Sequence, residues 1–597
     1  MADNQKKIIP INYTNREFDS IKKDLEQIAE RLYPDSFQDF SEASFASLMI
    51  DAVAYVGDQL SFYMDYNVNE SFLDTAYQFN NVLRHGRVLG YKFQGRPSTY
   101  GSAAFYVTIP SSATGLGPNM NYAPVLKRGS QFRSSTGLNY TLMDNINFAD
   151  NKHPQVVAKT NSNGSPTHYG IKAYGRVVSG ISLTEQVNIG SFQKFARVRL
   201  STPNVSEILS VFDSDGNEYF EVDYLAQDIV YREIANSNYK SDNTPSIIKP
   251  FLVSRKFVVE NVGASVLLQF GSGKEAANDL VSSPQSVSMN VFGKTYTTAQ
   301  SFDPTRLAEN EALGIVPENT TLTVVMRTTN PGNSNLAVGQ LVQVGQVFME
   351  FENRAILSAG LISDVRNSVE VDNEQPITGD VTNPSTDEIK QRIYDTFPTQ
   401  NRAVTQADYE NLAYRMHPKF GSVKRVSVQR DPDSQKRNLN MYVVSEDSFG
   451  NLTKTNSTIK RNLKVWLNQY RMINDTIDII DPYILNLGIE YSIKAKPGVD
   501  KKSVIGRCNR ALAQNFNNNY YIGESIKISD IYNTLNKITG VLDVLKVRLI
   551  KRTGPNYSSA TIDLNKNLSP DGDSLVVPKN AIVEFKFPAT DFVGRAR

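Results

Sequence analysis

The pattern of hydrophobic and polar positions in the first hundred residues predicts helices. Between residues 14 and about 95, apolar side chains recur at spacings of three and four, which places them on one helix face. Thr14 followed by Glu17 forms a capping-box pattern at the start of the first helix, and Pro34 is expected to end it. A second helix is expected from about residue 44 to 66, and a third helical segment from about 72 to the glycines at 86–90.

The expected second helix has a wide apolar face. Such a face implies burial against more than one partner helix. The segment could therefore form a small bundle by itself or one arm of an intermolecular bundle. The apolar positions are Phe45, Leu48, Met49, Ala52, Val53, Val56, Leu60 and Tyr63.

From about residue 100 the period of the pattern changes to two, which is typical of strands. Residues 102–109 alternate, and Pro110 follows them. Stretches rich in Gly, Asn and Ser are expected to form long loops between short strands. We therefore expect residues 99–380 to be β-rich, in one domain or two. The expected loops are 111–122, 160–170 and 235–246, and further strand candidates are 196–200, 208–212, 257–259 and 266–270.

After residue 383 helices and strands alternate, which predicts α+β structure. Ser385 and Glu388 form a second capping-box pattern, in a helix that Pro398 is expected to stop. Thr405 is expected to cap the next helix, with Asp408 in its first turn. Further helices are expected at 456–470, 501–517 and 529–538, and strands at 422–429, 438–444, 476–480, 484–494 and 541–550.

Together these patterns predict a multidomain α+β protein. Its parts would be an N-terminal helical domain at 1–98, a β-rich middle at 99–380, an α+β domain at 381–555 and a C-terminal extension of short strands and turns at 556–597.

Charge and composition narrow the classes of function. The chain has 63 Lys and Arg against 62 Asp and Glu, so it lacks the overall positive excess of a nucleic-acid-binding protein. No run of about 18 apolar residues predicts a membrane span, and no signal peptide is expected. The single cysteine, Cys508, excludes a disulfide within the chain.

The sequence contains no complete catalytic or metal-binding motif. None of the four histidines has a histidine three or four residues away, and one cysteine cannot build a multi-thiolate site. The segment 271–275 departs from a phosphate-binding loop, because Leu268 replaces its first glycine and Glu275 its Ser or Thr. In 213–217 the glycine stands at the fourth position rather than the sixth of a calcium loop, so a hairpin turn is expected. We therefore expect no enzyme, cofactor or metal site.

Six segments, in order along residues 40–550, carry a family resemblance. The most specific is 397–410, which contains the pattern NRAVT-x-x-DYE with Arg402, Thr405, Asp408 and Tyr409. It resembles the baseplate J-like family, and within it the large wedge subunit of T-even-type contractile phage tails. In the family pattern an acidic residue follows the glycine of the VLLQFG segment, where this chain has Ser272. The other similar segments are 45–91, 126–141, 266–273, 317–335 and 521–541.

The resemblance implies a structural protein of the virion tail baseplate, assembled in the host cytoplasm. It would pair with itself through the C-terminal domain, join a ring of wedges around the hub and pass on the change that triggers sheath contraction. Implied partners are a wedge protein that bundles with the N-terminal helices, a small wedge protein near the tube and sheath, and hub proteins, with no nucleic acid or membrane. The expected interface and motif residues are Phe45, Leu48, Val56, Phe72, Arg402, Thr405, Asp408 and Tyr409.

Two alternatives stay open at this point. The β-rich, tyrosine-rich middle would also suit a tail protein that binds or degrades glycans, which would need a groove in residues 100–370 with paired carboxylates about 5–10 Å apart. The same family resemblance would also suit the equivalent wedge protein of a phage-like contractile injection system.

Overall fold

The chain separates into two compact units. The computed structural model describes residues 17–32, 44–93, 95–112, 117–235, 246–262, 265–274, 313–330, 332–352, 354–433, 438–516 and 520–597. One unit combines residues 1–92 with 384–400, and the other combines 93–383 with 401–597. The predicted fold class, α+β with several domains, is confirmed. The finer boundaries at 98, 380 and 555 stay a prediction.

The first unit is helical, as the sequence predicts. Ser44 caps α2 by accepting a hydrogen bond from the backbone N–H of Ser47 (3.1 Å). The third helix is shorter than expected and begins only at Phe79, because residues 71–78 form a turn. The predicted start at Thr14 and stop at Pro34 lie outside the described residues. The helices are α1 (Phe18–Leu32), α2 (Phe45–Glu70), α3 (Phe79–Val88) and α7 (Thr386–Thr399).

Helix α7 packs closely against α3, although some 300 residues separate them in sequence. Gly86 permits this approach, because a Cβ atom there would lie 2.8 Å from Cδ1 of Ile393. Two predicted details of α7 are wrong. Ser385 caps the helix, but Glu388 pairs with Arg392 (2.6 Å) instead of completing a capping box. Pro398 lies inside the helix, which ends one residue later, where Gln400 adopts a left-handed conformation (φ 42°).

The first sheet of the second unit is antiparallel, with the order β17-β3-β4-β7-β1-β19 and β6 paired to β7. Alternate residues of β1 point into a core that includes Phe105 and Phe132, and helix α6 (Ala359–Asn367) lies against this strand. The strands are β1 (Tyr100–Pro110), β3 (Gln131–Ser134), β4 (Asn139–Leu142), β6 (Gln155–Thr160), β7 (Pro166–Ser179), β17 (Leu341–Val344) and β19 (Glu370–Asp372).

The second sheet has the order β8-β16-β10-β11-β14-β15-β9 and its own apolar core. The long strand β7 leads into it, because Gly180 (φ 92°) turns the chain directly from β7 into β8. Its strands are β8 (Ile181–Ile189), β9 (Arg197–Arg199), β10 (Val205–Phe212), β11 (Glu218–Glu221), β14 (Lys256–Val262), β15 (Ser265–Phe270) and β16 (Thr320–Thr328). Smaller sheets pair β12 (Ile229–Ala235) with β13 (Ser246–Leu252), and β2 (Val125–Leu126) with β5 (Ile146–Asn147) and β18 (Met349–Glu350).

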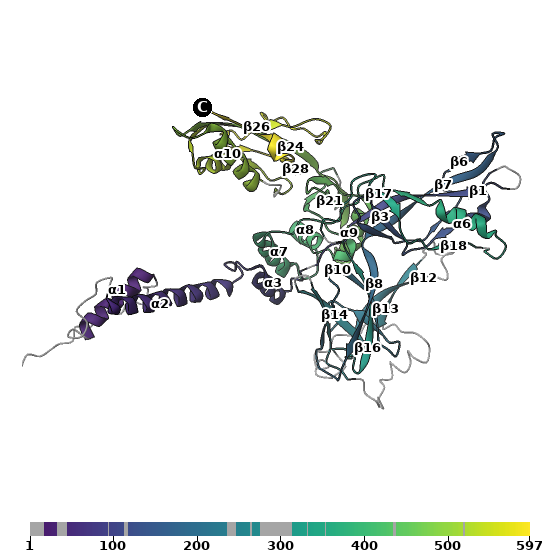
Figure 1. Ribbon diagram of the computed structural model, residues 1–597, viewed down its shortest axis with the longest axis horizontal. Coiled ribbons are helices and arrows are strands. Elements are labelled where there is room, and N and C mark those ends of the chain that lie inside the picture. Colours follow the sequence, from purple (N-terminus) through teal and green to yellow (C-terminus); the bar gives the residue numbers. More distant parts are fainter. Residues whose placement is uncertain are drawn as a thin grey trace, which may run out of the picture. The chain divides into compact units, whose positions relative to one another are not determined.

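Two further sheets, each with helices on one face, complete the second unit (Figure 1). The first has the order β20-β21-β22, with β23 parallel to β21, and packs with α8 and α9. The other has the order β26-β24-β28, with β29 also paired to β24, and packs with α10 and α11. The elements are α8 (Gln406–Tyr414), β20 (Arg425–Arg430), β21 (Asn438–Glu446), β22 (Leu452–Lys454), α9 (Ser457–Leu467), β23 (Thr476–Ile480), β24 (Tyr483–Ala495), α10 (Lys501–Asn515), α11 (Ile528–Asn536), β26 (Val541–Lys551), β28 (Ala581–Glu584), α12 (Pro588–Asp591) and β29 (Phe592–Ala596), with β25 (Ile526–Lys527) paired to β27 (Ser574–Leu575).

Most elements expected after residue 383 are present within a few residues of their predicted bounds. In the β-rich middle, by contrast, some predictions of loops and strands are wrong. Residues 160–170 were expected to be a loop, but β7 begins at Pro166 and runs for 14 residues. The expected loop at 235–246 lies mostly outside the described residues. The predicted hairpin turn at 213–217 is confirmed, because Asp213 accepts hydrogen bonds from the backbone N–H groups of Asp215 and Asn217 between β10 and β11.

Replacing Thr405 with Ala should destabilise the second unit by about 1 kcal/mol. Thr405 and Asp408 form a capping box at α8, in which the Thr405 hydroxyl accepts from the Asp408 N–H (3.2 Å) and the Asp408 carboxylate from the Thr405 N–H (2.8 Å). Urea unfolding followed by circular dichroism measures the loss. Ser358→Ala is the matched control, because Ser358 precedes α6 without a side-chain capping bond. Equal losses in the two variants would contradict the capping role.

Candidate functional site: an exposed helical face and a buried polar junction

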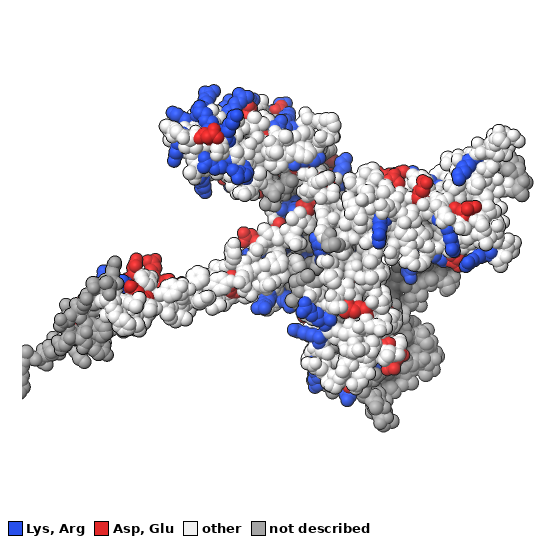
Figure 2. Space-filling view, viewed as in Figure 1, with Lys and Arg blue, Asp and Glu red and all other residues white. Residues whose placement is uncertain are grey.

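Helix α2 exposes large apolar side chains over most of its length, and its visible surface carries few charged side chains (Figure 2). Ser47, Ala54 and Glu70 are its buried residues. The predicted interface residues Phe45, Leu48 and Val56 are exposed, and so is Phe72 just after the helix. A hydrophobic face left open in one chain is typical of a surface that another protein covers. The other exposed apolar residues of α2 are Met49, Val53, Tyr55, Leu60, Phe62, Tyr63, Met64 and Val68.

Helix α1 covers only one side of α2. The Ile21 side chain faces Gly57, where a Cβ atom would lie 3.3 Å from Ile21 Cδ1, and Lys22 Nζ lies 2.7 Å from the Asp51 carboxylate. Beyond this contact α2 continues past α1 (Figure 1), and four large apolar side chains there are 57–68% exposed. The uncovered part of α2 is therefore broad enough for more than one further helix. These four side chains are Phe62, Tyr63, Met64 and Val68.

The end of α2 is held by the carboxylate of Glu70. It accepts hydrogen bonds from the backbone N–H of Tyr77 (2.8 Å) and Gln78 (3.1 Å) and from the amide of Asn81 (2.8 Å). The bond from Asn81 holds the pKa of Glu70 below its usual value. Because Gln78 precedes α3 directly, this carboxylate joins the end of α2 to the start of α3.

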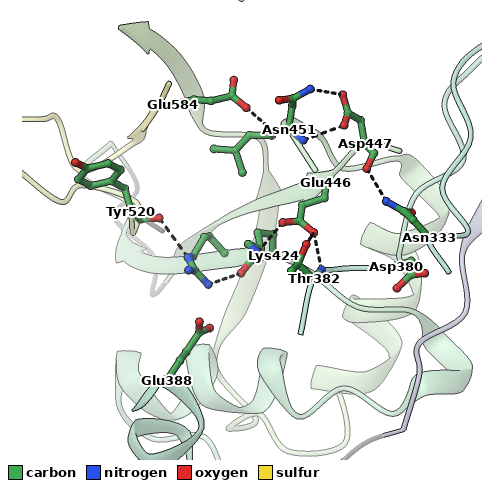
Figure 3. A network of polar contacts seen from close by, with 12 residues as sticks. Asn333, Asp380, Thr382, Glu388, Lys424, Glu446, Asp447, Asn451, Tyr520 and Glu584 are labelled. Carbon is green, nitrogen blue, oxygen red and sulfur yellow. Dashed lines mark hydrogen bonds and ion pairs between the residues drawn. The ribbon is translucent and has the colours of Figure 1, made fainter. Parts of the chain in front are cut away.

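A second feature, the polar junction, lies in the second unit around the end of β21 (Figure 3). The Glu446 side chain is 3% exposed and lies 2.6 Å from Lys424 Nζ, which is 11% exposed. Its other oxygen accepts hydrogen bonds from the N–H (2.6 Å) and the hydroxyl (2.9 Å) of Thr382. Thr382 lies in the segment between β19 and α7, so Glu446 binds this connecting segment to the β20–β23 sheet.

Asn335 and Asp380 extend the polar junction. Asn335 Nδ2 donates to the backbone carbonyls of Asp380 (2.8 Å) and Glu446 (3.0 Å), and Asn335 Oδ1 accepts from the Asp380 N–H (3.0 Å). The Asp380 carboxylate accepts from the Ser334 N–H (3.0 Å). Burial raises the pKa of Asp380 from 3.8 to about 6.

Glu584 links the same region to the last sheet. Its carboxylate accepts from the Leu452 N–H (2.6 Å), at the start of β22, and from the Asn486 amide in β24 (2.7 Å). Burial raises the pKa of Glu584. A separate contact supports the other side of β22, where Asn456 caps α9 and donates to the Tyr100 carbonyl in β1 (2.6 Å). Carboxylates and amides from two sheets, and from the connecting segments that hold Asn335, Asp380 and Asn456, therefore meet near the β21–β22 hairpin.

The conspicuous 397–410 segment has a structural part in this arrangement. Thr405 and Asp408 cap α8, and Tyr409 is buried with its hydroxyl donating to Asp475 (2.7 Å). Arg402 is exposed, and it donates no side-chain hydrogen bond to any described residue. The four residues lie in or next to α8, but away from the polar junction. The four residues expected at the bundle lie in the other unit.

Nothing in the sequence pattern singles out the polar junction, because its members come from distant segments and follow no spacing. By contrast, the carboxylates of α2 follow a regular spacing that is readable in the sequence. They are Asp51, Asp58 and Asp65, each seven residues from the next.

Open grooves lie in the C-terminal half of the chain. One of about 770 Å³ is lined by residues between 528 and 575, and one of about 790 Å³ by residues between 447 and 587. Neither falls in residues 100–370, where the glycan alternative places its groove. A smaller hollow of about 260 Å³ is lined partly by that range, with Asn204 and Asn261 among its residues. Among the described residues, no group of three or more His, Cys, Asp or Glu side chains is arranged to hold a metal ion. No helix in the described ranges is long and apolar enough to span a bilayer.

Residues 18–88, which comprise α1 to α3, match the family model of the N-terminal domain of bacteriophage baseplate proteins. This match supports a structural role in a baseplate. No curated protein sequence matches the chain.

Solved baseplate structures show a weak overall likeness. A chain of the anti-feeding prophage baseplate has 13% identity and a TM-score of 0.23, over 94% of this chain and 90% of that chain. A chain of the TssK-TssF-TssG baseplate subcomplex of the type VI secretion system has 9% identity and a TM-score of 0.23, over 73% of this chain and 96% of that chain. A TM-score of 0.23 is too low to establish a common fold.

Replacing Glu446 with Gln should destabilise the second unit by about 3 kcal/mol, because it leaves the buried Lys424 ammonium without its counter-charge. Chemical unfolding of the full chain measures the loss. Glu350→Gln is the matched control, since Glu350 pairs with Lys127 at the surface and such pairs contribute about 0–1 kcal/mol. A loss no larger than the control's would show that the polar junction does not stabilise the fold.

Asp380 should make stability fall as pH rises. Its folded pKa of about 6 lies above the unfolded 3.8, so the native state binds the proton more tightly between these values. Asp380→Asn removes this dependence, and the variant should gain about 3 kcal/mol on the native protein between about pH 4 and pH 7. Urea unfolding across this range measures the difference, with Asp215→Asn in an exposed turn as control. Parallel curves for the native protein and Asp380→Asn would contradict the assignment.

Proposed function

We propose that this protein is a wedge subunit of the baseplate of a contractile phage tail. It joins a ring of wedges around the central hub and passes on the rearrangement that triggers sheath contraction. The observation that carries this proposal is the exposed apolar face of α2, within the segment that matches the baseplate N-terminal domain.

The energetics of α2 support an assembly role. Each large apolar side chain that becomes fully buried contributes about 1.5–3 kcal/mol. Helix α2 carries many such side chains within 26 residues, so covering the helix would supply enough free energy for a permanent interface. A helix of this kind gains its stability by packing in a bundle, and the partners come from other wedge proteins.

The polar junction supports the mechanical part of the proposal. A satisfied buried network holds its members in one arrangement, and breaking a buried charge pair costs several kcal/mol. Glu446, Asn335 and Glu584 therefore make the second unit resist deformation near the β21–β22 hairpin. A displacement applied to one of its sheets would be passed to the others.

Tailed particles from the source lysate provide the test. Quantitative mass spectrometry of purified, dissociated particles should find this chain at a fixed low multiple of the hub proteins, with far fewer copies than the sheath. Its absence from intact particles would refute the proposal.

Leu48→Asp together with Val56→Asp should abolish incorporation into particles without unfolding the chain. Both side chains are exposed in the free protein, so the charges disturb only a surface that a partner covers. Circular dichroism checks folding, and mass spectrometry of particles checks incorporation. Ile473→Asp is the control, because Ile473 is 96% exposed and lies in the other unit. Normal incorporation of the double variant would rule out α2 as an assembly interface.

A further inference from the structure

Strand β26 is an edge strand of the last sheet. Its neighbour on one side is β24, and among the described residues no strand lies on its other side. Two register shifts interrupt the pairing before Lys546, whereas residues 546–551 pair with β24 in a regular antiparallel register. The second half of β26 therefore presents a regular row of backbone groups, to which another strand can be added.

Alternate residues of β26 use their backbone groups to bind β24. In an antiparallel pair, every second residue directs its N–H and C=O toward the partner strand, and the residues between them direct theirs away. The Arg552 N–H donates to the Asn486 carbonyl (3.0 Å) directly after β26. By this alternation, the backbone groups of Arg548 and Ile550 also face β24.

The other residues of the row direct their backbone groups outward. The N–H of Val547 confirms this direction, because it donates to the hydroxyl of Tyr532 in α11 (3.0 Å) rather than to β24. Leu549 and Lys551 follow at the same spacing, so their N–H and C=O groups also point outward. No strand in the described part of the chain pairs with them.

A groove of about 770 Å³ lies along this free edge. Residues 547–551 of β26 line it, together with the start of α11 and residues between 563 and 575. Part of its lining is apolar and includes Leu549, Ile528 and Leu568. Because another segment of the chain lies across from β26, the groove suits a single extended segment better than the edge of a second folded sheet.

The face of this sheet that is turned away from α10 and α11 is basic. Val547 and Leu549 belong to the core under these helices, so Lys546 and Arg548 lie on the opposite face, where both are exposed. Residues 483–597 contain 17 Lys and Arg against 10 Asp and Glu. Figure 2 shows basic side chains gathered over this part of the chain. The same face also holds the basic Lys494 and Arg595 and the acidic Glu490 and Asp543.

A strand added to β26 would meet two different surfaces, because its side chains alternate between the two faces of the sheet. On one face they would lie beside Lys546 and Arg548, where opposite charges on neighbouring strands stabilise the pairing. On the other face they would enter the apolar groove next to Leu549. The acids of the groove, Asp563 and Asp573, belong to the segment across from β26. The matching strand therefore alternates acidic and apolar residues.

Strand β26 of a second copy does not have this composition. Two β26 strands placed edge to edge would bring Lys546, Arg548 and Lys551 of both copies together. Like charges on neighbouring strands destabilise their pairing. Pairing of β26 with itself is therefore disfavoured.

We propose that the free edge of β26 is a strand-addition site, which binds an extended segment of another protein with alternating acidic and apolar residues. Backbone hydrogen bonds to Leu549 and Lys551 hold the segment, and the two rows of side chains select its sequence. This inference goes beyond the proposed function, which assigns no contact to β26.

Binding of a synthetic peptide to the purified full chain tests the proposal. The probe is a fluorescent, end-blocked octapeptide that alternates valine and glutamate, and its anisotropy should rise to saturation. A peptide with lysine in place of glutamate has the wrong charge, and one with all valines before all glutamates lacks the alternation. Both should bind at least about tenfold more weakly. Absence of saturable binding, or equal affinity for either control peptide, would overturn the proposal.

Lys546→Glu together with Arg548→Glu should lower the affinity for the valine–glutamate probe more than about tenfold, because like charges then face each other. Lys501→Glu together with Lys502→Glu makes the same change in net charge at exposed positions of α10, and this variant should bind like the native chain. Circular dichroism checks that both variants fold. Equal losses would mean that the probe responds to net charge alone, against the proposal.

Lys551→Pro removes one outward N–H and leaves the bonds to β24 intact, a change that edge strands tolerate. It should weaken probe binding about fivefold relative to Lys551→Ala, and this pair serves if the charge-reversed variant does not fold. Hydrogen exchange gives a second measurement, in which the probe should slow the amides of Leu549 and Lys551. Probe binding without this slowing would place the peptide elsewhere. Slowing that instead grows with the concentration of the chain alone would assign the edge to a second copy. Either result overturns the inference, and neither depends on the wedge assignment.

Discussion

The buried carboxylate of Glu446 is the interaction on which the arrangement of the second unit depends. Located at the end of β21, it neutralises Lys424, holds Thr382 by two hydrogen bonds and leaves its backbone carbonyl to Asn335. A charge is an expensive way to join apolar domains, because both ions lose their hydration. What it provides is direction: the hydrogen bonds are satisfied in one arrangement of the sheets, whereas apolar surfaces tolerate several. This specificity suits a protein that must hold a fixed geometry within an assembly.

The two units differ in whether their apolar surfaces are buried. In the second unit, apolar cores are closed and polar contacts connect them. In the first, α2 leaves much of its apolar surface open, and among the described residues α1 covers part of it. A helix of this composition exposes more apolar surface than one chain buries. This is why the sequence pattern predicts a helical bundle that needs a partner. The closed cores that stabilise the fold thus lie in the second unit, and the open surface suited to assembly lies in the first.

Sequence reasoning located α1 to α3 and most of the helices and sheets after residue 383, because these elements have clear periodicity and capping signals, but it did not predict α6 in the β-rich middle. Thr405 and Asp408 form the capping box at the expected helix, and Ser44 caps α2 at the expected start. Sequence reasoning failed at β7, where glycine, asparagine and serine suggested a loop and pairing with β1 overrode the local preference. The exposed α2 residues could be named from the width of the apolar face. The polar junction could not, because contacts between residues such as Asn335 and Glu446 depend on tertiary structure alone.

The contact between α3 and α7 has a consequence for synthesis of the chain. Gly86 packs against Ile393, which the ribosome synthesises only later. At about 5–20 residues per second, a ribosome needs roughly 15–60 s to cover the intervening 300 or so residues. During that interval the N-terminal helices emerge with their apolar surfaces open and part of their own unit missing. The order of translation therefore favours early capture of these helices by a partner or a chaperone over folding in isolation.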